Sequence, residues 1–224
     1  MARSLEELQN TDEPGIEVIR DWLGQASGNG AVLLTHEKAL AEATLLQLQV
    51  TTRSLLGAVV YDTGGILVDD GFLRILGSGR ERSLLQSNRS AGLLTDNEDP
   101  SGALLVADDV MGGLFALNGG GFGSENMGEV FYLAADEMAW TPLEMGYSDF
   151  LAWCLTGDRT MLYETLASFD AFTYRPRPPI SSTYSFYPFL WTREAHAQTP
   201  DVRVIPAEEI VRLRLELVGF TLSP

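Results

Sequence analysis

The spacing of short apolar runs in the middle of the chain limits its possible folds more than any other feature. Two runs, Leu114–Leu117 and Val130–Ala134, flank a connection that contains Gly119–Gly123. Parallel strands need crossovers of about a dozen residues or more, so the short turns at Asp62–Gly65 and Asp69–Gly71 predict antiparallel pairing between successive strands. The predicted strands are Gly57–Tyr61, Ile66–Val68, Phe72–Leu76, Leu104–Ala107, Leu114–Asn118 and Val130–Ala134.

Helical patterns lie on both sides of this predicted sheet in the sequence. Ser4 with Glu7 forms a capping box that predicts a helix at Leu5–Gln9. A second predicted helix carries Ile16, Ile19, Trp22 and Leu23 on one face, and a third begins at Thr35. A single helical turn is predicted at Leu84–Asn88. The remaining predicted helices are Ser148–Leu155, Arg159–Ser168 and Ala207–Leu217. We therefore expect an α+β fold: a mostly antiparallel sheet, N-terminal helices, and further helices packed on one face.

At 224 residues the chain fits a single domain. We expect residues 1–50 to be mainly helical, 55–145 to form the sheet and 146–170 to form helices. Residues 174–224 are expected to form an extended strap and a C-terminal helix, because prolines concentrate at Tyr174–Pro179. The polar stretch Thr95–Gly102 predicts a surface loop, and Pro188 limits Phe186–Trp191 to an edge strand.

The chain is strongly acidic, with a formal net charge of −16 and a pI of about 4.4. No Lys or Arg occurs from Ser90 to Asp158, whereas twelve Asp and Glu residues do. Binding to nucleic acid and to anionic membranes depends on positive charge, so both are disfavoured. Attraction of a basic partner protein is favoured, and plain solubility is the alternative reason for the charge.

The only cysteine is Cys154, so no intrachain disulfide can form. It lies in the apolar pattern around Leu151, which predicts a buried, unreactive thiol. The sequence MARSLEEL lacks the apolar core of a signal peptide, and no run approaches eighteen apolar residues. We therefore expect a cytoplasmic protein.

No motif predicts a catalytic, cofactor-binding or metal-binding residue. The run Gly119–Gly123 is followed by a strand pattern, whereas a phosphate loop needs a helix there. The doublets Asp69-Asp70, Asp108-Asp109 and Asp136-Glu137 lie at predicted strand ends, where aspartate commonly closes turns. His36 and His196 have no partners at metal-ligand spacing and are expected at the surface.

Four segments carry a family resemblance: Gln49–Gly79, Leu104–Gly120, Gly146–Asp158 and Ser185–Trp191. Together they resemble an uncharacterised bacterial domain-of-unknown-function family, number 2625, over nearly the whole chain. The family pattern has a Trp-Asn pair where this chain has Ser87-Asn88. The resemblance implies no activity.

The order of elements in Leu104–Leu155 is also similar to the SUKH superfamily, whose α+β members often act as immunity proteins that neutralise toxins. This resemblance and the charge bias lead to our main hypothesis, a non-catalytic binding protein, immunity-like, with an acidic surface. The expected contact residues are Asp108, Asp109, Asp136 and Glu137.

Two alternatives stay open. One is an enzyme with a carboxylate-based site that draws on Asp62, Asp69 and Asp108. The other is a self-associating structural protein in which an exposed aromatic tail, Tyr184–Trp191, docks on a second subunit and forms a homo-oligomer.

Overall fold

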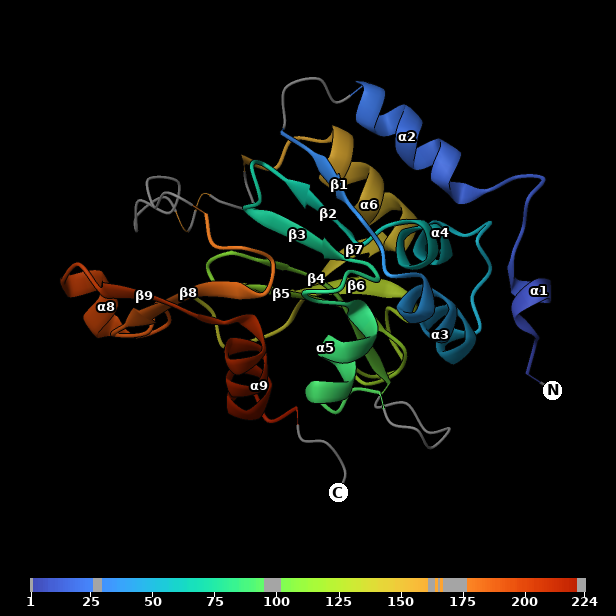
Figure 1. The fold of residues 1–224 in the computed structure, drawn as a ribbon. Coiled ribbons are helices and arrows are strands. Elements are labelled where there is room, and N and C mark those ends of the chain that lie inside the picture. Colours follow the sequence, from blue (N-terminus) through green and yellow to red (C-terminus); the bar gives the residue numbers. More distant parts are fainter. Residues whose placement is uncertain are drawn as a thin grey trace.

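The protein is built around a seven-stranded antiparallel sheet in which every strand pairs with the next strand along the chain (Figure 1). The computed structural model describes residues 2–25, 30–94, 102–160, 164, 166 and 177–220. The strands are β1 (Val32–Leu34), β2 (Gly65–Val68), β3 (Leu73–Leu76), β4 (Ala103–Asp109), β5 (Leu114–Asn118), β6 (Glu129–Leu133) and β7 (Thr141–Gly146). This sheet confirms the predicted α+β class and the antiparallel pairing.

One face of the sheet packs against helices from the N-terminal region and the middle of the chain. These are α2 (Gly15–Gln25), α3 (Lys38–Leu48), α4 (Leu55–Asp62) and α6 (Tyr147–Thr156), and α1 (Leu5–Leu8) packs on α3. Alternate strand residues such as Ile66, Ile75 and Phe115 point to this side and are fully buried. Phe115 stacks on Tyr132 with 4.4 Å between ring centroids and meets Phe150 of α6 at 5.3 Å. The main hydrophobic core therefore lies between the sheet and these helices.

The second face carries the C-terminal elements and α5 (Leu84–Ser90), which lie on the opposite side of the sheet from α2 and α6 (Figure 1). The C-terminal elements are a separate two-stranded sheet of β8 (Ser182–Tyr187) and β9 (Asp201–Pro206), with α8 (Arg193–Ala197) and α9 (Ala207–Leu217). Helices therefore cover both faces, whereas the sequence had predicted the further helices on one face. None of the described helices has the length and apolarity to cross a bilayer.

Several element predictions were wrong. Gly57–Tyr61 belongs to helix α4 and is not a strand, and β1, β7 and β9 were not predicted. In contrast, β5 and α9 have the predicted bounds. The strand near the aromatic tail is β8, which ends before Pro188. The predicted loop Thr95–Gly102 and the predicted helix Arg159–Ser168 lie mostly outside the described residues, as does the first half of the strap Tyr174–Pro179.

Candidate functional site

A buried ion pair between β3 and β4 lies at the centre of the second face. Arg74 and Asp108 are direct cross-strand partners, so their side chains leave the sheet on the same side. The guanidinium binds both carboxylate oxygens, with Nε and Nη2 each 2.8 Å from one of them. Both side chains are 1% exposed. The pair is therefore shielded from water, and the two charges must be satisfied inside the protein.

Arg82 extends this pair into a chain of charges that reaches the C-terminal helix. Its Nη1 lies 2.5 Å from the Asp108 carboxylate, and its Nε lies 2.8 Å from the Glu208 carboxylate. Ser87 and Ser90 of α5 donate hydrogen bonds to Glu208 at 2.7 and 2.9 Å. We call Arg74, Arg82, Asp108 and Glu208 the charge cluster. It connects the sheet, α5 and the first turn of α9.

Main-chain carbonyls of the C-terminal region also accept hydrogen bonds from the charge cluster. Arg74 donates to the carbonyl of Ser182, and Arg82 donates to that of Ile180 at 3.3 Å. Neighbouring Asn88 joins α5 to the sheet through two side-chain hydrogen bonds with the main chain of Leu105. Ser87, the residue before Asn88, places its hydroxyl against Glu208. These contacts hold distant segments together.

The carboxylate of Asp109 is held separately from the charge cluster. It accepts hydrogen bonds from the main-chain N–H groups of Met111 and Gly113, and from the Tyr132 hydroxyl at 2.9 Å. Burial nevertheless raises the pKa of Asp109, because the low-dielectric interior disfavours its charged form. A side chain at Gly113 would have no room, since its Cβ would lie 2.0 Å from this carboxylate. Asp109 therefore closes the turn between β4 and β5.

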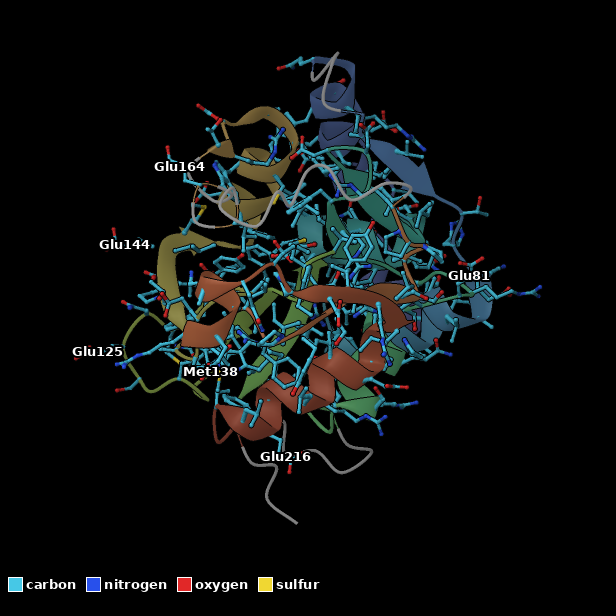
Figure 2. All side chains as sticks on the ribbon, turned by 90° about the vertical axis from the view of Figure 1, so that its left-hand side faces the viewer. Glu81, Glu125, Met138, Glu144, Glu164 and Glu216 are labelled. Atoms are coloured by element: carbon cyan, nitrogen blue, oxygen red, sulfur yellow. The ribbon has the colours of Figure 1, made fainter. Side chains whose placement is uncertain are left out.

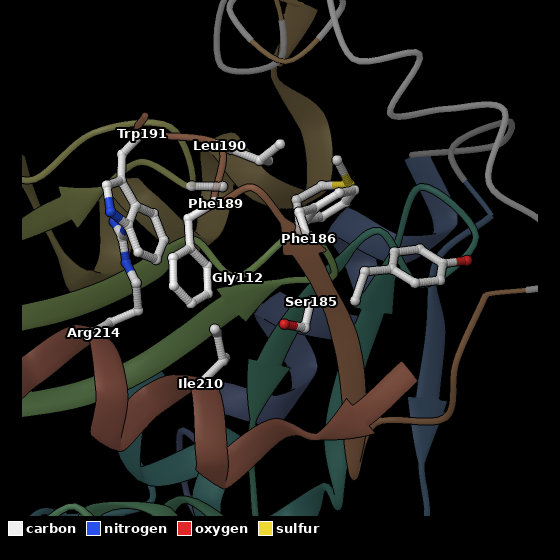
Figure 3. A pocket seen from close by; sticks show the side chains of 11 residues that line it. Gly112, Ser185, Phe186, Phe189, Leu190, Trp191, Ile210 and Arg214 are labelled. Carbon is white, nitrogen blue, oxygen red and sulfur yellow. The ribbon is translucent and has the colours of Figure 1, made fainter. Parts of the chain in front are cut away.

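Arg214 of α9 is a third buried arginine. It packs against the Trp191 ring with 4.5 Å from Cζ to the centroid, and Phe189 stacks on Trp191 at 4.5 Å (Figure 3). Its Nη2 donates to the carbonyls of Ala134 and Glu137, both at 2.6 Å. Burial lowers the pKa of Arg214 to about 10. The adjoining cavity of about 10 Å³ has room for about one water molecule, so this aromatic region is filled by its own side chains.

The four residues predicted to contact a partner do not form one surface. Asp108 and Asp109 are 1% and 0% exposed, so the expectation that they lie at the surface was wrong. Both follow an apolar run that is buried to its end, and arginine or main-chain groups replace water around them. Asp136 is half-buried and Glu137 is exposed, and a partner contact at these two stays a prediction.

The three carboxylates of the alternative enzyme site lie in three different surroundings. The Asp69 carboxylate accepts hydrogen bonds from Nε and Nη2 of Arg159, each at 2.8 Å. Asp108 belongs to the charge cluster instead. Asp62 is half-buried at the end of α4, and burial raises the pKa of its carboxyl. The structure therefore assigns Asp69 and Asp108 to separate arginines.

The aromatic tail is largely buried against its own chain. Tyr184, Phe186 and Leu190 pack with Phe72 in a second hydrophobic cluster, while Tyr187 is 75% exposed. The prediction of an exposed tail was wrong for the buried three. The sequence signal missed here is the alternation of Val202 and Val204 with polar residues, which marks β9 as the partner strand of this tail.

The glycine-rich run is a hairpin connection, as predicted. It joins β5 to β6, and the Asn118 side chain accepts a hydrogen bond from the main-chain N–H of Gly120 at 2.8 Å. Phe122 within the run stacks on Phe131 at 4.5 Å and contacts Trp140 at 4.9 Å.

Cys154 is fully buried, as predicted, and burial raises the pKa of its thiol. Both His36 and His196 are exposed. Within the described ranges no group of three or more His, Cys, Asp or Glu residues is placed to hold a metal ion.

A groove with a volume of about 390 Å³ opens beside the charge cluster, at the β1 end of the sheet. Its lining residues come from β1–β2, the segment after β3, and the strap before β8: Leu34, Thr35, Gly64, Leu67, Gly79, Arg80, Glu81, Arg82, Pro179 and Ile180. Leu34 and Leu67 belong to the same sheet face as Arg74. The buried arginines at this face had no sequence signal, because β3 and β4 are separated by a long connection that leaves their register open.

Comparisons with known proteins identify the family. A family model described as "Protein of unknown function DUF2625" matches residues 5–210. The chain is 40% identical over 221 residues to the putative uncharacterized protein YbfG of Escherichia coli K12, which covers 96% of this chain and 97% of that protein. It is also 40% identical over 167 residues to an uncharacterized protein of Haemophilus influenzae Rd, covering 73% and 72% of the two chains. The chain therefore belongs to the DUF2625 family of proteins of unknown function.

Proposed function

We propose that the protein is a non-catalytic binding protein that receives a basic partner protein on its acidic exterior. The observation that carries this proposal is the unequal burial of charge. Among the described residues, three arginines, Arg74, Arg82 and Arg214, are buried, against two buried acids, Asp108 and Asp109. Without these five residues the sequence has 12 basic and 29 acidic residues, a net charge of −17, which is one unit more negative than the whole sequence.

The best contact surface lies along the β7 side of the sheet, within the stretch that lacks Lys and Arg. We define the acidic edge as Glu125, Glu137, Glu144 and Met138, all of which are exposed. Figure 2 shows Glu125, Glu144 and Met138 on the same side of the molecule. Glu137 replaces the buried Asp108 and Asp109 as the principal expected contact, with Asp136 half-buried beside it.

The chemistry of this edge selects the partner. Unpaired surface carboxylates accelerate association with a positively charged protein, and the attraction weakens with salt. The thioether of Met138, which is 37% exposed, adds an adaptable apolar contact. A basic toxin would make the protein immunity-like, which is the narrower form of this proposal.

Charge reversal tests the proposal. The variant Glu125→Lys/Glu137→Lys/Glu144→Lys is compared with the control Glu6→Lys/Asp12→Lys/Asp21→Lys, in which exposed acids near the N-terminus are reversed. Both variants change the net charge equally. Basic proteins captured from the source cytoplasm by the unmodified chain should be lost from the first variant and kept by the control, and elution should begin as NaCl rises from about 50 to 500 mM. Equal capture by the two variants would refute the acidic edge as the contact surface.

A further inference from the structure

We infer that the groove beside Arg82 binds a small organic carboxylate with an apolar body. This site is independent of the acidic edge, because β1 and β7 are the two opposite ends of the seven-stranded sheet. A volume of about 390 Å³ lies within the range of roughly 300–1,000 Å³ that is usual for small-molecule sites.

The apolar walls of the groove are the reason why we expect the body of the ligand to be apolar. Leu34 and Leu67 supply one wall, and Pro179 and Ile180 supply another. The side chains of Leu34 and Leu67 are half-buried and lie on the same face of the sheet. Transfer of an apolar group from water to such walls is favourable by about 25 cal/mol for each Å² buried.

Arg82 is the reason why we expect the ligand to carry a carboxylate. It is 3% exposed, and its Nε and Nη1 bind Glu208 and Asp108, but its buried Nη2 has no hydrogen-bond partner within the described part of the chain. A buried charged donor without an acceptor is costly, and an incoming acceptor relieves that cost. A carboxylate matches the planar guanidinium better than a neutral oxygen does.

The other charged groups of the groove lie at its mouth. The Arg80 side chain is 87% exposed and lies 3.6 Å from Glu37, and Glu81 is exposed. These groups are solvated, so their net effect on a bound anion is small. We therefore expect Arg82 to determine the preference of the groove for a carboxylate over a neutral group.

The base of the groove consists of closely packed, hydrogen-bonded backbone. Gly64 donates its N–H to the carbonyl of Leu34 at 2.7 Å, and Gly79 forms a bridge with His36. A Cβ at Gly64 would lie 2.2 Å from the Thr35 carbonyl oxygen, and one at Gly79 would lie 2.6 Å from the Gly64 carbonyl oxygen. A preformed site loses little conformational entropy on binding, which favours affinity for a small ligand.

Titration with octanoate tests this site, and 1-octanol is the uncharged control of equal chain length. Amide resonances of Gly64, Gly79 and Ile180 should shift in a saturable way, together with the side-chain resonances of Arg82. Octanoate should bind about tenfold more tightly than 1-octanol. An absence of saturable shifts, or equal affinity for the two probes, would overturn the inference.

Two tryptophan variants locate the binding. Leu34→Trp should fill the groove and abolish octanoate binding. Leu33→Trp is the matched control, because Leu33 lies on the same strand, points to the other sheet face, is 38% exposed and is absent from the groove lining. Both positions lie on the short edge strand β1, so thermal melting verifies that each variant folds. Octanoate affinity that survives Leu34→Trp would rule out the groove.

Discussion

At the scale of single residues, the charge cluster shows what a buried arginine provides that a lysine would not. The guanidinium of Arg74 satisfies both oxygens of Asp108 and the main-chain carbonyl of Ser182 at the same time. A lysine ammonium is a point charge without this planar fork, so it cannot match a carboxylate bidentately. Asp108 in turn is shared by two arginines, which makes it the residue on which the cluster depends.

Asp108→Asn should destabilise the protein by about 3–5 kcal/mol, because it leaves two buried guanidinium groups without their shared anion. The free energy of unfolding, measured by urea denaturation, gives the size of the effect. Asp21→Asn on the exposed side of α2 is the matched control and should change the free energy by less than about 0.5 kcal/mol. A loss below about 1 kcal/mol for Asp108→Asn would contradict the role given to the cluster.

The sequence identified Asp108 and Asp109 as notable residues but misplaced them. Acidic doublets at strand ends are usually solvated, and turn chemistry accounts for Asp109 as predicted. Their burial depends on arginines that come from other elements, 34 residues away for Arg74 and 26 for Arg82. No local pattern contains that information.

At the scale of elements, the helix α4 shows where periodicity fails. Its sequence LLGAVVYD is apolar on nearly every side because the helix is buried between α2, α3 and α6. A short, continuously apolar run with β-branched residues looks the same as a buried strand. The residue that distinguishes a helix from a strand here is Ser54, the N-cap of α4. Its side chain accepts a hydrogen bond from the Gly57 N–H at 3.0 Å.

Ser54→Ala should therefore lower the free energy of unfolding by about 1 kcal/mol, through loss of the helix cap. Ser54→Asp keeps an acceptor at the same position and should restore most of the stability. Ser54 is exposed, so neither change disturbs packing. Chemical denaturation of the three proteins measures the effect, and equal stability of the alanine and aspartate variants would show that the cap does not matter.

Both outer strands of the sheet resist pairing with another chain. β1 has three residues, and β7 contains Pro142, a register shift and Glu144 at a φ of 56°. Short edges, proline and irregular pairing all prevent strand addition. A partner at the acidic edge is therefore expected to bind through side chains. The irregularity also explains why β7 gave no clear alternating pattern in the sequence.

At the scale of the whole molecule, the excess of negative charge outside the core acts against compactness. Repulsion among unpaired carboxylates favours the expanded chain, and salt screens it over a Debye length of about 10 Å at 0.1 M. The melting temperature should therefore rise as NaCl increases from about 10 to 300 mM. The triple lysine variant of the acidic edge should show a smaller rise, and an unchanged or falling melting temperature for the unmodified protein would contradict this account.

The overall architecture was the most predictable level. Tight turns between apolar runs fix neighbouring strands as antiparallel, as the pairs β2–β3 and β4–β5 show. The placement of the last third of the chain was not predictable, because β8, β9 and α9 meet the sheet through contacts between residues far apart in sequence.

The order of strands and the charge cluster together bear on how the chain folds during synthesis. Each of β1 to β7 can pair as soon as the following strand leaves the ribosome, since sequence neighbours are also spatial neighbours. In contrast, two hydrogen bonds of the charge cluster join residues far apart in the sequence. Arg74 donates to Ser182, which follows 108 residues later, and Arg82 donates to Glu208, which follows 126 residues later. A nascent chain that stops short of α9 therefore has a paired sheet with an unfinished, charged second face.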